Sequence, residues 1–579
     1  MNRDETVALF LECEAKRQEA HAAALAEGKS KYEAEEVAHE AAKAPWNAWA
    51  GALLAKRKAM EADGSWVLQK KWFGDIEAGN SETEAWMDEA SADFSHVRFE
   101  PPAAADAKEA PVQQEGEAGQ PYKLIETAGE TADFRGFVFP GATYFRNTIF
   151  SATAEFTNAV FPAEVHFPDA AFASPANFDN ATFTGDADFA GATFTAAAYF
   201  NGTAFVCDVV FGNAKFLRTA NFEGAIFSGE AGFGNARFTR GAYFEDAMFR
   251  GDADFETAAF SGDGSFQNAA FSACAYFEHA NFEGGAWFTN ASFARTTRFQ
   301  HAWFRQKVDF AGITSQHSFA LTAAHFLRRV PNLQTARFAG PVAVDGIRFG
   351  AEVAPGGPLL SALGGSFLLA AGEPDAALSM KYRVLKRLAA LGGDPASEQS
   401  FFQSEMRARR YREDKPWHPA FWLGIAYELF SSFGHSVFRP IFWLAALTLV
   451  SGWFYLAQHK GAELSLRAEF QGRIVPLLPD RLQALLPAQQ PQPPLACKHG
   501  EGSPAAAAAL LAIRHGSVLG TLDTAWSAQI YGCLYGLDAD GKTPGAPDAV
   551  MFWGIAQTVL SAALWCLLLL GLRNQFRIR

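Results

Sequence analysis

Residues that carry chemistry in other proteins occur throughout this sequence, but their spacing fits no common catalytic or metal-binding pattern. The six cysteines form no CxxC pair, so neither a structural zinc site nor a disulfide framework is predicted. We expect no P-loop, and we find no G-x-G-x-x-G fingerprint and no HExxH motif. The run Gly434-His435-Ser436-Val437-Phe438 lacks the final glycine of a nucleophile elbow. We therefore expect no enzyme, no cofactor and no bound metal.

A second set of residues is typical of a pore rather than of catalysis. The glycine-rich run Tyr531-Gly532-Cys533-Leu534-Tyr535-Gly536 has the character of irregular backbone that is tolerated at membrane depth where it lines water. Asp523, Asp538 and Asp540 are candidates for a ring around a cation entrance in an oligomer. The alternative is an exported loop whose acidic residues are simply solvated. No potassium-type TVGYG filter is present.

Two apolar segments must position this run. Residues 440–457 and 549–572 contain no charged side chain, and a membrane core needs about 20 apolar residues. Ser503 and Pro504 predict the start of a short helix that ends near Ile513 and dips into the bilayer. We expect a first span at 436–458, a second at 549–572, and between them an extracytoplasmic loop, 459–548, with a re-entrant helix at 504–514. Cys497 and Cys533 are candidate disulfide partners in that loop.

Basic residues predict the orientation of the two spans. They gather in a helical connector with an interfacial helix, 374–435, and in a tail, 573–579. The positive-inside rule then places both termini in the cytoplasm, with the chain in the plasma (inner) membrane. The alternative is that these side chains only solvate a helix face. The residues expected to contact anionic lipid are Arg407, Arg409, Arg410, Arg412, Arg573 and Arg577.

Phenylalanine recurs with a strict spacing between Phe145 and Phe310. The gaps alternate between five and six residues, and alanine usually stands two positions before each Phe. A step of five residues turns a helix by about 140°, which moves the side chain off any apolar stripe. Frequent Gly, Asp, Asn and Thr instead predict a turn after each very short strand. The expected fold is a four-sided β-solenoid with Phe pointing inward, including Phe183, Phe189, Phe194, Phe200, Phe222 and Phe255.

The pattern Ala-(Asp/Asn)-Phe, as in Ala187-Asp188-Phe189 and Ala220-Asn221-Phe222, resembles the pentapeptide-repeat family. The resemblance implies a right-handed quadrilateral β-helix, which we place at 131–350. It is flanked by an α-helical N-terminal region, 1–99, with a linker at 100–130. Phe433–Pro440 and Leu572–Arg577 further resemble the membrane-anchored branch of that family, as does Trp46-Asn47-Ala48-Trp49. That branch implies a two-helix transmembrane end resembling a simple ion-channel pore.

Charge weighs against nucleic acid as a partner. The net charge is -14, which repels phosphate backbones. Some relatives mimic DNA, but Arg237, Arg240 and Arg250 interrupt any continuous anionic stripe. Asn180 and Asn290 match glycosylation sequons and are expected to be corner residues instead.

Two functional interpretations remain open. The first is an oligomeric, ion-channel-like protein whose solenoid senses a partner or a state, with Thr448, Ser451, Gly452 or Ser561 at contacts between copies. The second is a membrane-tethered scaffold whose solenoid docks cytosolic proteins. Both predict membrane lipids and a protein as partners, and the first also predicts a homo-oligomer.

Overall fold

The computed structural model describes residues 1–70, 76–101, 123–127, 131–350, 377–409, 417–434, 436–458, 504–517, 530–531, 534–535 and 546–575. The chain forms two compact units, Met1–Ala408 and Arg409–Arg579. The predicted fold class is confirmed: a β-solenoid is flanked by helices, and two helices near the C-terminus are long and apolar enough to cross a membrane.

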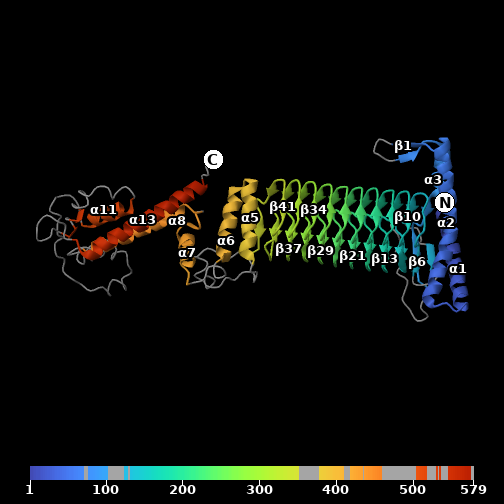
Figure 1. Ribbon diagram of the computed structural model, residues 1–579, viewed down its shortest axis with the longest axis horizontal. Helices are drawn as coiled ribbons and strands as arrows, with labels where there is room; N and C mark the ends of the chain where they lie inside the picture. The colour runs from blue at the N-terminus through green and yellow to red at the C-terminus, as the bar shows by residue number, and fades with distance from the viewer. Residues whose placement is uncertain are drawn as a thin grey trace, which may run out of the picture. The chain divides into compact units, whose positions relative to one another are not determined.

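The first unit is built around a four-sided solenoid, the rod that runs from blue-green to yellow in Figure 1. One coil passes through β19 (Val209–Val210), β20 (Lys215–Phe216), β21 (Ala220–Asn221) and β22 (Ile226–Phe227). The next coil begins at β23 (Ala231–Gly232), which pairs in parallel with β19. From β7 (Thr143–Tyr144) to β40 (His325–Phe326), paired strands are 22 residues apart, as the spacing of Phe predicts.

The four sheets are numbered here in the order in which one coil visits them, and they hold eleven, twelve, nine and nine strands. Sheet 1 runs from β3 (Ala92–Asp93) to β42 (Val342–Ala343), and sheet 2 from β5 (Lys123–Glu126) and β4 (Val97–Glu100) to β43 (Arg348–Phe349). Sheet 3 runs from β6 (Thr131–Asp133) to β37 (Val308–Asp309), and sheet 4 from β10 (Val160–Phe161) to β41 (Arg337–Phe338).

Stacked phenylalanine rings fill the interior of the solenoid. Phe222 lies between Phe200 and Phe244, with ring centroids 4.8 Å from each, which is the spacing of adjacent strands. Small inward residues such as Ala220 make room for the rings, because the side chains of a strand alternate between its faces. The six Phe residues predicted to point inward are all fully buried: Phe183, Phe189, Phe194, Phe200, Phe222 and Phe255.

Two of the four corners use a left-handed residue, which recurs every eleven residues along most of the rod. Asn180 has φ 55° and Asn290 has φ 59°, so both predicted corner residues lie at such positions. Asn, Asp and Gly adopt this conformation with the least strain. At these corners side chains also reach the next coil, since Thr257 Oγ1 donates to Asn235 Oδ1 at 2.7 Å.

The solenoid departs from the predicted pattern in two places. It begins at Ala92, because β3 and β4 pair with the following coil and Phe94 and Phe99 join the core; the boundary at residue 131 was too late. Near its end Ser315 occupies an inward Phe position, and Phe319 contacts the rings of Phe299 and Phe310 instead. A large residue at the neighbouring position therefore fills the space that a small one leaves.

Helices cover the N-terminal end of the rod (Figure 1). Capping boxes at Asn2 and Ser30 begin α1 (Arg3–Ala26) and α2 (Lys31–Asp63), and Asn80 begins α3 (Ser81–Ala90). A two-stranded sheet, β1 (Leu68–Lys70) with β2 (Ile76–Ala78), lies between α2 and α3 in sequence. Phe10 and Trp46 are fully buried against the first coils. The N-terminal region is therefore a cap that shares its core with the solenoid.

Two more helices cover the other end of the rod. In α5 (Leu378–Gly392), Tyr382 and Leu385 are fully buried, and Phe401 of α6 (Pro395–Arg409) joins the same core. Phe349 of the last coil contacts the rings of both Tyr382 and Phe401. Residues 378–408 are therefore a C-terminal cap of the solenoid, and the predicted connector at 374–435 is corrected to that extent.

The second unit contains α7 (Pro419–Ser431), α8 (Phe438–Ala457), α11 (Pro504–Gly516) and α13 (Asp548–Gln575). Among the residues that the structure describes, α8 and α13 are the two helices long and apolar enough to span a membrane. Their outward side chains include Leu449, Phe552 and Ile555, which are 75%, 74% and 68% exposed. So much exposed apolar surface on a helix is costly in water and favourable in lipid.

Candidate functional site

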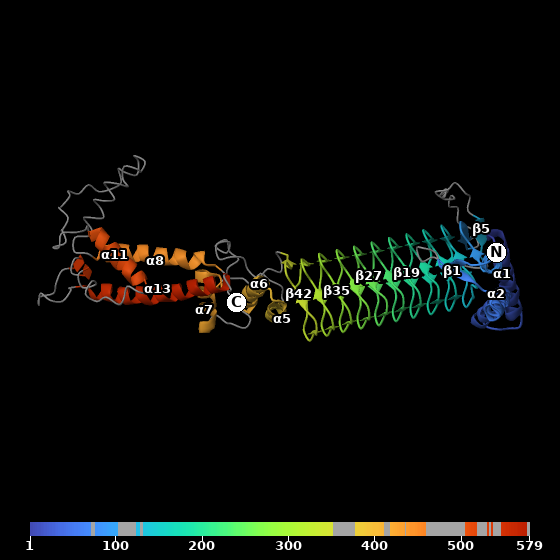
Figure 2. The same cartoon turned by 90° about the horizontal axis from the view of Figure 1, so that it is seen from above.

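The short helix α11 lies alongside both apolar helices of the second unit (Figure 2). Its small residues permit this close packing: a side chain at Gly452 of α8 would meet Ala512 of α11 at 3.6 Å. Ala508, Leu511 and Ala512 are buried in the same cluster as Tyr455 of α8. Close approach of small residues is the usual way in which helices associate in lipid.

Hydrogen bonds between polar side chains join the three helices. We call this group the polar cluster; it consists of Tyr455, His515, Tyr531, Tyr535, Gln557 and Thr558. Gln557 of α13 is fully buried, accepts from Tyr455 Oη at 2.8 Å and donates to Ala512 O at 2.7 Å. Tyr535 Oη donates to Tyr455 O at 2.9 Å. The side-chain amide of Gln557 in α13 thus bonds to both α8 and α11.

His515, near the end of α11, is a second residue of the polar cluster that contacts two other members. Its Nδ1 lies 3.0 Å from Thr558 Oγ1 and its Nε2 lies 3.0 Å from Tyr531 Oη. A side chain at Gly554 would stand 3.2 Å from the imidazole, so the absence of a side chain there makes room for the ring. Ionisable groups among apolar helices often mark pathways for ions or protons.

The two C-terminal motifs noted in the sequence meet in space. Asn574 Nδ2, in the second motif, donates to Gly434 O, in the first, at 3.1 Å. Gly434 has φ 79°, and a side chain there would stand 3.0 Å from Asn574 Nδ2 and from Tyr427 Oη. Arg439 donates to Glu428 O, which closes the C-terminal end of α7. These motifs fasten α7 and the start of α8 to the end of α13.

The predicted pore residues are only partly described. Tyr531 and Tyr535 lie in the polar cluster, whereas Asp523, Gly532 and Gly536 lie outside the described residues, as do Asp538, Asp540 and the Cys497–Cys533 pair. Ser451 and Gly452, expected at contacts between copies, are used within the chain: Ser451 accepts from Trp553 Nε1 at 3.1 Å. Sequence reasoning missed His515 and Gln557, although a lone polar residue in an apolar run is a usable signal.

The predicted lipid-facing basic residues fall into two groups. Arg407 is partly buried in α6 beside the solenoid end, and Arg573 is exposed on the last turn of α13. Arg409 ends α6, while Arg410, Arg412 and Arg577 lie outside the described residues. Nothing in these positions tests contact with lipid, which stays a prediction.

The prediction that the chain holds no P-loop overlooked one match, in the segment between the two apolar helices. Residues 536–543 read Gly-Leu-Asp-Ala-Asp-Gly-Lys-Thr, which has the spacing of a phosphate-binding P-loop. They lie outside the described residues. The preceding described residues, Leu534 and Tyr535, are helical rather than part of a buried strand, and Asp538 and Asp540 carry the wrong charge for a phosphate cradle. We infer no nucleotide site from this match.

In the N-terminal cap, side chains form the hydrogen bonds that one more strand would form at the end of the rod. Asn47 Nδ2 donates to Gly136 O at 3.0 Å and its Oδ1 accepts from Val138 N at 2.9 Å. Trp46 Nε1 donates to Val138 O at 3.0 Å. The Trp-Asn-x-Trp motif therefore satisfies backbone groups that would otherwise be left open at the edge of a sheet.

Beneath this cap lies a buried ionic cluster around Asp133, whose side chain is fully buried. Arg135 binds it through two nitrogens, at 2.9 and 2.6 Å, and His39 Nδ1 and Arg17 Nε lie 3.4 and 3.8 Å away. Burial alone raises the pKa of Asp133, but the hydrogen bonds from Arg135 and His39 and the charges of Arg135 and Arg17 lower it well below its ordinary value. In the described residues no group of His, Cys, Asp or Glu is arranged to hold a metal ion.

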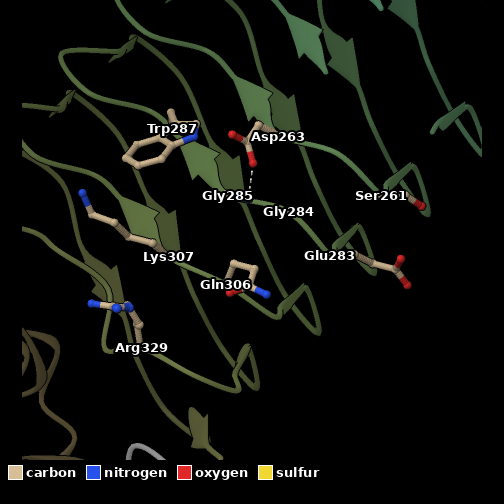
Figure 3. Close-up of a pocket in the computed structure, with 9 residues that line it drawn as sticks. All are labelled: Ser261, Asp263, Glu283, Gly284, Gly285, Trp287, Gln306, Lys307 and Arg329. Atoms are coloured by element: carbon tan, nitrogen blue, oxygen red, sulfur yellow. Dashed lines mark hydrogen bonds between the residues drawn. The ribbon is translucent and has the colours of Figure 1, made fainter. Parts of the chain in front are cut away.

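Figure 3 shows a shallow hollow on the outside of the rod, at the corner between sheets 2 and 3. Gly284 and Gly285 leave its floor open, and Asp263 Oδ1 accepts from Gly285 N at 2.7 Å. Lys307 Nζ lies 4.5 Å from the ring centroid of Trp287. The aromatic face is thus already covered by a cation, and the carboxylates of Asp263 and Glu283 share the hollow with Lys307 and Arg329.

Comparison with known proteins supports the identification of the rod. Residues 134–182, 211–259 and 244–292 match a family model described as pentapeptide repeats (9 copies). No curated protein and no solved structure was found to match the chain. The match covers part of the rod and none of the helices. The function of the second unit must therefore be argued from its own geometry.

Proposed function

Because the rod is a pentapeptide-repeat β-solenoid and two apolar helices follow it, we propose that this chain is an integral membrane protein that forms an ion-channel-like oligomer. In this proposal α8 and α13 cross the plasma (inner) membrane, both termini are cytoplasmic, and the rod is the sensing or interaction domain. The basic residues that flank the two helices support this orientation.

The observation that carries the proposal is the position of α11. It has 13 residues, so it is about 20 Å long, too short to cross a hydrocarbon core of about 30 Å. It packs against both apolar helices and is bonded to α13 through Gln557. Short helices that end within the membrane, next to spanning helices, are a recurring element of selective pores.

The proposal requires several copies of the chain. Two spanning helices and one short helix cannot enclose a water-filled path, and Tyr455, Tyr535 and Gln557 of the polar cluster are buried within a single copy. The outward faces of α8 and α13 are strongly apolar, with Leu449 and Phe552 largely exposed. These faces are available to lipid and to further copies.

A membrane-tethered scaffold is the second candidate. It is favoured by the rod itself, which carries exposed Leu217 and Trp303 on one outward sheet. Repeat proteins commonly bind partners through such surfaces. In this alternative the apolar helices only anchor the chain.

Conductance across planar bilayers tests the proposal. We expect ion currents from the purified full chain, and loss of these currents in Gln557→Leu, which removes the two hydrogen bonds that Gln557 makes to Tyr455 and Ala512. Val559→Leu, at an exposed position of α13, is the matched control and should conduct. Silence of the parent protein in several salts would favour the scaffold. Equal currents from the parent and from a variant lacking residues 504–537 would exclude α11 from the pore.

A further inference from the structure

Four exposed cations on two adjacent coils lie close to an exposed leucine that directly follows a strand of sheet 2. We propose that this surface, the basic quartet of Lys215, Arg218, Arg237 and Arg240 together with Leu217, is a docking site for an acidic peptide segment that carries one apolar side chain. The inference rests on the proposed role of the rod as an interaction domain and is independent of whether the helices conduct ions.

The quartet is built by the register of the solenoid. Lys215 of β20 pairs directly with Arg237 of β24 (Arg237–Phe238), and Arg218 and Arg240 stand at the corner that follows each strand. In Figure 1 this part of the rod lies beside the strand labelled β21. Adjacent coils are about 4.8 Å apart. The four cations therefore form a compact grid, and Leu217, 40% exposed, lies within it.

The four cations of the quartet differ from other cations on the rod in their ion-pair partners. Arg298, Arg305 and Lys307 each face a carboxylate, at 3.5, 3.9 and 3.3 Å. Across the described ranges of the chain, no carboxylate lies within ion-pair distance of any quartet member. Like charges on directly paired strands destabilise a sheet. A bound anionic segment would relieve this repulsion as well as gain its own ion pairs.

The quartet stands out against an acidic background. Between Phe145 and Phe310 the rod carries 18 Asp and Glu against 10 Lys and Arg, so four of its ten cations lie within 26 residues. Asp208 and Glu230 line the corner between sheets 4 and 1, and Glu223 and Glu245 follow the neighbouring strands of sheet 3. An extended polyanion or a flat membrane would also meet these carboxylates, whereas a short peptide can stay on the quartet.

Leu217 favours a peptide with an apolar residue over a purely ionic ligand. Leu217 lies between Lys215 and Arg218 in sequence, and its neighbours on the adjacent coils are the exposed residues Thr195 and Thr239. Apolar contacts at the centre of a polar rim provide most of the binding energy in protein interfaces. Charge on the rim mainly accelerates association and sets specificity.

Fluorescence anisotropy with the full chain in detergent tests the proposal. The probes are a labelled peptide, Glu-Glu-Glu-Leu-Glu-Glu-Glu, and its alanine version. The quartet variant is Lys215→Ser, Arg218→Ser, Arg237→Ser and Arg240→Ser. The control variant is Arg295→Ser, Arg298→Ser, Arg305→Ser and Lys307→Ser, which changes the net charge equally. Both variants are compared with the parent by thermal unfolding before binding is measured.

We expect the parent to bind the leucine probe with an affinity that falls with salt, the quartet variant to bind at least about tenfold more weakly, and the control variant to bind within about twofold of the parent. Leu217→Ser should weaken binding of the leucine probe and leave the alanine probe unchanged. An equal loss in both quadruple variants, or no binding by the parent, would overturn the proposal. Tighter binding of single-stranded DNA or of phosphatidylserine vesicles than of the peptide would overturn it as well. Because conductance is measured separately, failure here leaves the channel proposal unaffected.

Discussion

At the scale of single residues, Asn47 shows how a solenoid can be closed by one side chain. Its amide matches the donor and acceptor of a missing strand, and the bonds run to Gly136 and Val138. The sequence offers the motif but not its partners, which lie about 90 positions away along the chain. Hydrogen bonds across such a distance are set by tertiary packing and cannot be predicted from local patterns.

Asn47→Ala should destabilise the N-terminal end of the rod. The substitution leaves a part-buried backbone donor and acceptor without their side-chain partners, and the cost is at most about 1–3 kcal/mol for each group. We expect faster hydrogen exchange at Val138 N–H, with smaller changes in the coils around Phe222. Tyr32→Ala, at a position 82% exposed on α2, is the control and should leave exchange unchanged. Unaltered protection of Val138 in Asn47→Ala would contradict this description of the cap.

The ionic cluster at Asp133 makes the cap sensitive to acid. The pKa of Asp133 is lowered in the folded state, so its contribution to stability is present above the ordinary value near 3.8 and is lost as the pH falls through the folded pKa. At pH 7, Asp133→Asn should destabilise the fold by no more than about 3 kcal/mol. It removes the carboxylate that Arg135 binds, but the Arg135 side chain is 32% exposed and Arg17 keeps Glu14 and Glu35 as ion-pair partners.

Thermal unfolding between pH 7 and pH 2 checks this expectation. The parent should lose stability below about pH 4, and Asp133→Asn should lose less over the same interval because its pH-dependent group is gone. Asp88→Asn, at an exposed position on α3, is the control and should follow the parent. Parallel pH profiles for the parent and Asp133→Asn would refute the assignment.

At the scale of elements, the strict spacing of Phe predicted the solenoid. The helices and strands at its two ends could not be predicted in the same way. Few folds are compatible with a large apolar residue that recurs every five or six positions and always points inward. The helices α5 and α6 have ordinary amphipathic sequences, which are compatible with a membrane connector as well as with a cap. The sequence also did not predict that Phe319 fills the core space next to Ser315, because both serine and phenylalanine are acceptable in a strand.

Gly392 tests the packing of α5 against the last coil. A methyl group at this position would stand 2.6 Å from Val342 O, an oxygen held in the backbone of sheet 1. Gly392→Ala should therefore destabilise the C-terminal cap, although alanine is favoured over glycine in helices by about 1 kcal/mol. Gly51→Ala, in α2 with open space around it, should stabilise instead. Denaturant unfolding followed by circular dichroism measures both, and a gain in stability at position 392 would contradict the cap.

At the scale of the whole molecule, a β-solenoid capped by helices at both ends is followed by a second compact unit that contains the apolar helices. The two apolar runs predicted those helices, and the fold class followed from them together with the rod. The polar cluster of the second unit was not predicted, since Gln557, Tyr455 and His515 come from three different helices. Their association is a consequence of how α11 packs.

The number of copies in the membrane tests the central claim most directly. We would reconstitute the full chain in lipid nanodiscs and determine its mass by native mass spectrometry over a range of protein concentrations. The account predicts one discrete homo-oligomer of several copies, because a single copy cannot enclose a conducting path. A monomer at every concentration and in every lipid would contradict the channel-like assembly and leave the membrane-tethered scaffold in its place.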